Sequence, residues 1–209
     1  MQGGAGGCMP AALLGAWRSD SVTMGVVNIS ADLAAPRRKG PVCVWLTGLP
    51  GAGKSTIAGL LERRLIGLGQ LAYRLDGDEL RKGLNRDLGY SDADRTENVR
   101  RAAEVARLMV NAGVSPIVSL ISPFIADRAL ARAQFAAGEF CEVFVDAPLQ
   151  VCEARDPKGL YAKARRGEIT RFTGIDSRYE PPPQPHLHLH TDTEDLERCV
   201  QRILGLLHY

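Results

Sequence analysis

The sequence has no paired-cysteine motif, no apolar stretch of membrane length and almost no excess of charge. Its five cysteines are scattered without a C-x-x-C pair, so reduced, packed thiols are expected. No stretch reaches the roughly 18 apolar residues of a membrane span, and no secretory signal is recognisable. We therefore expect a cytoplasmic protein without a membrane partner. The net charge of +2 gives no strongly basic balance, so no nucleic-acid partner is expected.

The composition is that of an ordinary folded protein. Apolar residues make up 45% of the 209 residues and charged residues 24%, which excludes disordered and fibrous chains. This length suits one compact domain. Residues 1–39 lack the features of a targeting peptide, and we expect a flexible leader there. Because residues 36–40 form a polar, turn-prone junction, the domain is predicted to span 40–209.

Hydrophobic patterning predicts strands that alternate with helices along this domain. The expected strands are 42–47, 71–75, 114–121, 141–145 and 187–190. The expected helices begin at Lys54, at a capping box Ser91-x-x-Asp94, at Asp127, near Pro148 and at a cap Thr191-x-x-Glu194. This alternation predicts an α/β fold with a mostly parallel, five-stranded sheet and helices on both faces. Residues 77–90 are expected to be a long functional loop, and 156–180 a mobile lid.

A phosphate-binding motif lies between the first predicted strand and the first predicted helix. The pattern G-x-x-x-x-G-K-[ST] is matched in the correct context, which indicates a P-loop NTPase fold. Its glycines allow a tight turn of inward-facing N–H groups, and the helix N-terminus adds partial positive charge. Lys54 would bridge the β- and γ-phosphates of ATP, and Ser55 would bind Mg²⁺. The expected ATP-binding residues here are Gly48, Leu49, Pro50, Gly51, Ala52, Gly53, Lys54, Ser55 and Thr56.

The position of the acidic residues favours a small-molecule kinase over other P-loop proteins. The base-reading N-K-x-D of a GTPase is absent, and residues 119–123 place no aspartate after the third predicted strand. Asp76 and Asp78 follow the second strand instead. Carboxyl ends of parallel strands meet at the ligand crevice, so these acids can hold Mg²⁺ or orient an acceptor hydroxyl. Asp76 is the better candidate for the metal and Asp78 for the hydroxyl, but the sequence does not separate them.

Several further motifs follow in order, and together they resemble the adenylylsulfate kinase family. The resemblance covers about residues 40–191. Its motifs are residues 48–56, 75–81, 88–91, 94–101, 121–124, 127–128, 155–161, 172–176 and 179–180. The resemblance implies transfer of the γ-phosphoryl group of ATP to the 3′-hydroxyl of adenosine 5′-phosphosulfate, which gives PAPS and ADP in sulfate assimilation. It also implies a homodimer.

The resemblance implies roles for individual residues as well. Guanidinium groups of Arg81 and Arg95 suit phosphosulfate oxygens, and the amide of Asn98 suits the adenosine part. Tyr90 and Phe172 correspond to the pair that sandwiches the acceptor adenine, with Tyr90 in place of the more usual Phe. Lys158 corresponds to a lysine that closes over the nucleotide. The implied substrate-binding residues are Asp78, Arg81, Tyr90, Arg95, Asn98, Ile121, Ser122, Phe124, Lys158, Gly159, Leu160 and Phe172. The implied catalytic residues are Lys54, Asp76, Asp78 and Ser122, with Ser55 and Asp76 on the metal.

Two features are more simply explained by structure than by chemistry. Ser122 corresponds to a serine described as phosphorylated in some family members, but no histidine lies near it in sequence to activate it. A structural hydroxyl is favoured, since direct in-line transfer needs positioning only. His186, His188 and His190 alternate at strand spacing and could hold a metal. Because no acid or cysteine in that run completes a zinc set, a plain strand is favoured.

Two other functions remain open from the residues. One is a different small P-loop kinase, acting on a nucleoside monophosphate, a sugar acid or shikimate. The other is a catalytically silent nucleotide-sensing domain, although intact Lys54, Ser55, Asp76 and Asp78 argue against it.

Overall fold

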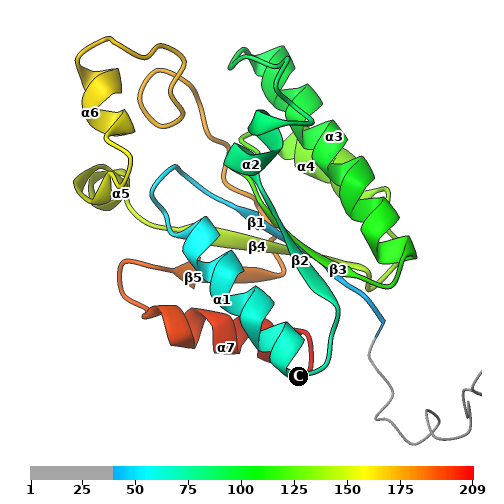
Figure 1. Cartoon of the computed structure of the whole chain (residues 1–209). Coiled ribbons are helices and arrows are strands. Elements are labelled where there is room, and N and C mark those ends of the chain that lie inside the picture. The colour runs from blue at the N-terminus through cyan, green and yellow to red at the C-terminus, as the bar shows by residue number, and fades with distance from the viewer. Residues whose placement is uncertain (1–39) are drawn as a thin grey trace, which may run out of the picture. The chain divides into compact units, whose positions relative to one another are not determined.

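The computed structural model describes residues 40–209, which form a five-stranded sheet with helices on both faces (Figure 1). The strand order is β2-β3-β1-β4-β5, and every pairing is parallel. The strands are β1 Cys43–Thr47, β2 Ala72–Asp76, β3 Ser115–Ser119, β4 Phe140–Asp146 and β5 Leu187–His190. The predicted α/β class is thus confirmed, and the sheet is wholly parallel. The predicted leader, 1–39, lies outside the described residues, so its division from the domain stays a prediction.

Helices α1 Lys54–Gly67 and α7 Leu196–Leu206 cover one face of the sheet, and α3 Asp92–Asn111 and α4 Ile125–Arg132 cover the other. The other helices of the described residues are α2 Gly77–Lys82, α5 Leu149–Arg155 and α6 Leu160–Arg165. Among these described residues, no helix is long and apolar enough to cross a membrane.

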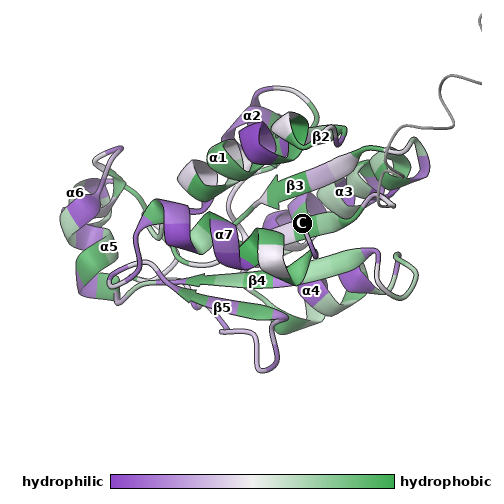
Figure 2. Ribbon diagram, turned by 90° about the horizontal axis from the view of Figure 1, so that it is seen from below, coloured by the Kyte–Doolittle hydropathy of each residue, from purple (hydrophilic) through white to green (hydrophobic). Residues whose placement is uncertain are grey.

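The alternation of side chains along β1 explains the two hydrophobic layers. Val44 and Leu46 face the cluster that contains α1 and α7, whereas Cys43 and Trp45 face the cluster that contains α3 and α4. Successive strand residues point to opposite faces, so a continuous apolar strand serves both layers at once. Figure 2 shows α7 carrying both green and purple residues, as expected for a helix with one face on the sheet.

Two local predictions need correction. Residues 77–90 are not all loop, because Asp76 caps a short helix, α2, by accepting a hydrogen bond from Asp78 N at 3.0 Å. The predicted lid, 156–180, contains the helix α6, and its role as a lid stays a prediction. The last helix is capped by Asp195, which accepts from Arg198 N at 2.7 Å, and not by Thr191. The predicted capping box of Ser91 and Asp94 at the start of α3 is confirmed.

The displaced cap at α7 has one tertiary and one local cause. The Thr191 hydroxyl donates to the carbonyl of Ala52 in the P-loop at 2.8 Å. The Glu194 carboxylate accepts from the backbone N–H of His190 at 3.0 Å. Both side chains are therefore engaged before the helix begins, and α7 starts only at Leu196.

Candidate active site

The P-loop joins β1 to α1, and two of its glycines are required by close packing. A Cβ at Gly48 would lie 2.2 Å from the carbonyl oxygen of Val145. A Cβ at Gly51 would lie 2.8 Å from the carbonyl oxygen of Cys152, and its φ of 76° also disfavours other residues. The loop is thus pressed against the end of β4 and against α5. Its last residue, Gly53, leads directly into the N-terminus of α1, the positive end of the helix dipole.

Lys54 is folded back into this loop. Its ammonium group donates to the carbonyl oxygens of Gly48 at 2.9 Å and Leu49 at 2.8 Å. Burial lowers the pKa of Lys54 to about 8, because the charged form loses its hydration there. The carbonyl dipoles only partly offset the positive charge of the lysine. The loop therefore favours an anionic ligand.

Polar groups from three neighbouring elements meet beside the lysine. The Ser55 hydroxyl at the start of α1 donates to Asp76 Oδ2 at the end of β2, at 2.6 Å. It also lies 3.2 Å from the hydroxyl of Ser119 at the end of β3. Asp76 is buried. This set of hard oxygen donors, next to a phosphate-binding loop, is chemically suited to Mg²⁺.

Asp78 has different surroundings from Asp76. Its side chain is exposed and forms an ion pair with Lys158, which lies 80 residues further along the chain. Lys158 belongs to the predicted lid, just before α6. The structure thus separates the two acids: Asp76 faces the P-loop serine and Asp78 faces the lid lysine.

A cavity of about 850 Å³ connects the P-loop with the segments expected to bind the acceptor. The predicted site residues that line it are Pro50, Gly51, Gly53, Lys54, Ser55, Thr56, Asp76, Asp78, Arg81, Tyr90, Arg95, Asn98, Ile121, Ser122, Lys158, Leu160 and Phe172. The predicted residues outside its wall are Gly48, Leu49, Ala52, Phe124 and Gly159. This volume falls in the range of small-molecule sites. Most of the predicted residues therefore share one space.

The acceptor end of the cavity contains the two predicted aromatic residues, which differ in exposure and packing. Tyr90 is 59% exposed, and the Arg81 guanidinium lies 4.4 Å from its ring centroid. Phe172 is 8% exposed and packs edge-on against Tyr161, with ring centroids 4.9 Å apart. Phe172 is thus a fixed wall, whereas Tyr90 presents most of its surface to solvent.

Arg95 connects the segments that carry these aromatic residues. Its guanidinium donates to the carbonyl oxygen of Tyr90 at 3.2 Å and to that of Arg171 at 2.5 Å. Burial, followed by the charge of Arg81, lowers the pKa of Arg95. The arginine therefore holds residues 90 and 171 together in the wall of the cavity.

Asn98 lies on α3 beside a fully buried asparagine. Its Oδ1 accepts from Asn85 Nδ2 at 3.0 Å. This bond takes one of the two acceptor positions of the Asn98 carbonyl, so the second position and the NH₂ group are the parts of the amide that can serve a ligand.

Ser122, in the wall of the cavity, has a constrained backbone. It has a φ of 39°, in a region that residues other than glycine seldom adopt. Its hydroxyl accepts from the indole nitrogen of Trp45, a fully buried residue of β1, at 3.1 Å. This contact supports a structural hydroxyl at Ser122.

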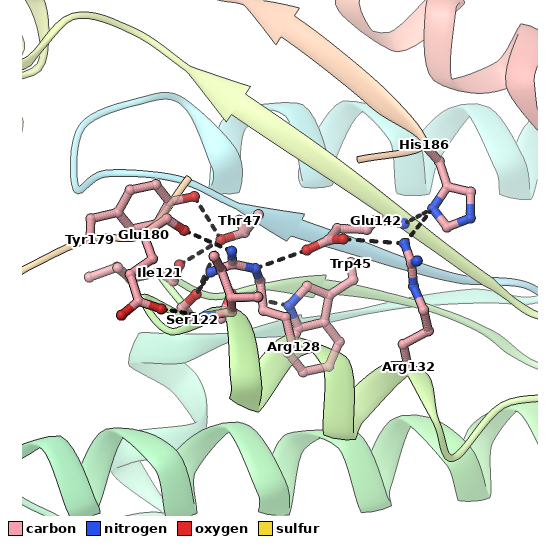
Figure 3. Close-up of polar contacts among 11 residues, drawn as sticks. Trp45, Thr47, Ile121, Ser122, Arg128, Arg132, Glu142, Tyr179, Glu180 and His186 are labelled. Atoms are coloured by element: carbon pink, nitrogen blue, oxygen red, sulfur yellow. Dashed lines mark hydrogen bonds and ion pairs between the residues drawn. The ribbon is translucent and has the colours of Figure 1, made fainter. Parts of the chain in front are cut away.

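A buried network, shown in Figure 3, fixes the loop that carries Ser122. Arg128 on α4 donates to Glu142 at 2.9 Å, to the carbonyl oxygen of Ser122 at 2.6 Å and to that of Glu180 at 2.7 Å. The Thr47 hydroxyl donates to the carbonyl oxygen of Ile121 at 2.8 Å. One arginine thus joins the 121–123 loop, the end of the lid segment and β4.

Comparison with known proteins agrees with this geometry. The family model for adenylylsulphate kinase matches residues 40–190. The chain belongs to the adenylylsulphate kinase family. An adenylyl-sulfate kinase of Pseudomonas aeruginosa is 55% identical over 174 residues, which is 83% of this chain and 89% of the relative. The solved Mycobacterium tuberculosis APS kinase CysC, in complex with AMPPNP and APS, is 52% identical with a TM-score of 0.78. That match covers 82% of this chain and 100% of the solved one.

Some other relatives that match this adenylylsulphate kinase region are longer proteins. The bifunctional enzyme CysN/CysC of Xylella fastidiosa is 59% identical over 177 residues, or 84% of this chain. The match covers 28% of that relative, so the chain corresponds to a minor part of its length.

The sequence does not predict how the supporting residues of this adenylylsulphate kinase site pair with one another. Arg128 stands in a motif that the resemblance included, but its partners Glu142 and Glu180 lie 14 and 52 residues away. Tyr179, whose hydroxyl is 2.9 Å from that of Thr47, is separated from it by 132 residues. No local pattern reveals such pairs. Tyr179 and Glu180, like Arg128, stand in motifs of the family resemblance, whereas the signal of Glu142 is a charged residue within the otherwise apolar strand β4.

Proposed function

We propose that this chain transfers the γ-phosphoryl group of ATP to the 3′-hydroxyl of adenosine 5′-phosphosulfate, giving PAPS and ADP. One observation carries the proposal: a single cavity joins the P-loop lysine and Asp76 to the arginines and aromatic residues of the acceptor end. The family match supports this reaction, and a 52% identical relative has been solved with AMPPNP and APS. We also propose, from the family, a homodimer that acts in the cytoplasm during sulfate assimilation.

In this proposal the P-loop holds the triphosphate. The α1 N-terminus and Lys54 bind the β- and γ-phosphates, after the lysine has exchanged the carbonyls of Gly48 and Leu49 for phosphate oxygens. Ser55 and Asp76 hold the Mg²⁺, which supplies charge neutralisation on the phosphates.

Asp78 and Lys158 complete the reacting end. The exposed Asp78 orients the acceptor hydroxyl, and Lys158 exchanges its partner Asp78 for phosphate when the lid segment closes. The attack is in line and direct, so Ser122 supports the loop and carries no phosphoryl group.

The acceptor adenine stacks between Tyr90 and Phe172. Phe172, 8% exposed, provides a packed surface, and Tyr90, 59% exposed, provides an open one. Each stacking contact contributes on the order of 1–3 kcal/mol by analogy with base stacking. Arg81 and Arg95 carry the positive charge that suits the phosphosulfate group.

A coupled ADP-release assay tests the proposal. ADP release by the purified chain with MgATP is compared among adenylylsulfate, AMP and gluconate as acceptors, and PAPS is identified directly. We expect turnover with adenylylsulfate alone, and its loss in Lys54→Ala and Asp76→Ala. Preference for AMP or gluconate would point to another small-molecule kinase. Binding of both nucleotides without any PAPS would point to a sensing domain.

A further inference from the structure

We propose that Asp146, His188 and His190 form a binding site for a divalent transition-metal ion of the zinc type, separate from the nucleotide site. The carboxylate oxygen and the imidazole nitrogens of these three residues all lie within 4.8 Å of one another. Two imidazoles and one carboxylate are a ligand set typical of zinc sites that keep a position open to solvent.

The sheet places these side chains together. His188 and His190 alternate along the edge strand β5, so they project from the same face. β4 runs parallel beside it, with Phe144 opposite His188 and Asp146 opposite His190. The acid that the 186–190 run lacks is therefore supplied by the neighbouring strand. Leu189, between the two histidines, is fully buried on the other face and anchors the strand.

The separations suit a common ion. Asp146 Oδ2 lies 2.9 Å from His188 Nε2 and 3.9 Å from His190 Nδ1. Two ligand atoms bound tetrahedrally at zinc distances are about 3.4 Å apart, so the observed values bracket the required one. The two imidazole nitrogens lie within 4.8 Å of each other, so the proposal requires side-chain rotations that bring all three separations to the tetrahedral value.

The surroundings hold the ligands without sealing the site. His188 stacks on the ring of Phe144 at 4.7 Å between centroids, and the His188 and His190 rings are 4.2 Å apart. His188 and Asp146 are partly exposed and His190 is exposed. An ion can therefore enter from solvent, and water can fill its remaining positions.

This site is chemically distinct from the one proposed for Mg²⁺. Ser55 and Asp76 offer oxygen only, which Mg²⁺ prefers. Imidazole nitrogen selects borderline ions such as Zn²⁺ over Mg²⁺. The two sites also differ in position, although two hydrogen bonds of Thr191 connect Asp146 with the P-loop. The Thr191 N–H donates to the Asp146 carbonyl oxygen at 2.9 Å, and the Thr191 hydroxyl reaches Ala52 in the P-loop.

Calorimetric titration with Zn²⁺ tests the proposal without reference to kinase activity. The full chain carries Cys8→Ser, which removes the one thiol outside the described residues, and nucleotide is omitted because it chelates metal. Excess Mg²⁺ is present throughout. We expect one equivalent of Zn²⁺ to bind and to raise the unfolding temperature with concentration. His188→Ala, His190→Ala and Asp146→Asn should each weaken binding about tenfold or more.

His186→Gln is the matched control. His186 lies on the same histidine run, but its Nδ1 accepts from Glu142 N at 3.0 Å and it is outside the cluster. It should leave Zn²⁺ affinity unchanged. Because His190 is exposed, its alanine variant should keep the fold, and circular dichroism checks this. The proposal is overturned if the His188→Ala/His190→Ala double variant binds Zn²⁺ as well as the parent, or if the parent binds none.

Discussion

Replacement of Arg128 by Met offers the sharpest test of how the 121–123 loop is held. The arginine side chain is 2% exposed, and its partner Glu142 is 10% exposed. Removal of one member of such a buried pair costs about 3–5 kcal/mol, because a buried charge loses its partner. Two carbonyl groups, of Ser122 and Glu180, lose their donor as well. Glu142 keeps Arg132 at 3.2 Å, so we expect the lower end, about 3 kcal/mol.

The measurement is urea unfolding followed by circular dichroism. At about 2–4 °C per kcal/mol for a domain of this size, the same change lowers the unfolding temperature by roughly 6–12 °C. The control is Arg132→Met, which touches the same carboxylate but is 43% exposed. It should cost about 0–1 kcal/mol. Equal losses in the two variants, or a loss below about 1 kcal/mol for Arg128→Met, would refute the reasoning. Arg128→Met should also raise the KM for adenylylsulfate more than that for ATP.

Three further predictions concern the site itself. Burial lowers the pKa of Lys54 to about 8, so near pH 8.5 much of it is neutral until phosphate restores its charge. MgATP binding at pH 8.5 should then take up protons, so the calorimetric heat of binding should depend on the ionisation enthalpy of the buffer. This dependence should be absent at pH 6.5 and in Lys54→Arg. A heat of binding at pH 8.5 that is the same in all buffers would contradict the prediction. Asp76→Asn should raise the Mg²⁺ concentration that gives half-maximal rate. Asp78→Asn should lower kcat and leave that Mg²⁺ concentration unchanged. If the rate of both variants depends on Mg²⁺ concentration in the same way, the assignment is wrong. Ser122→Ala should retain turnover within a few-fold. It should lose about 1–3 kcal/mol of unfolding free energy, because Trp45 Nε1 loses its hydrogen-bond acceptor. Abolished turnover would indicate a phosphoserine instead.

Local physics alone determined the sheet elements and the phosphate loop. Continuous apolar runs such as 42–47 predict buried parallel strands, because such strands are covered on both faces. The glycines at 48, 51 and 53 predict the loop, since few other residues adopt its backbone angles. The capping box at Ser91 is local as well, with donor and acceptor three residues apart.

The tertiary structure decided which groups meet across long separations. Asp76 and Asp78 look equivalent along the chain, but the fold turns one to Ser55 and the other to Lys158. Asp146 joins the histidines of β5 only because β4 pairs beside them. Sequence periodicity specifies the face on which a side chain projects, within one element. The partner on that face depends on strand order and register, which are set by packing of the whole sheet.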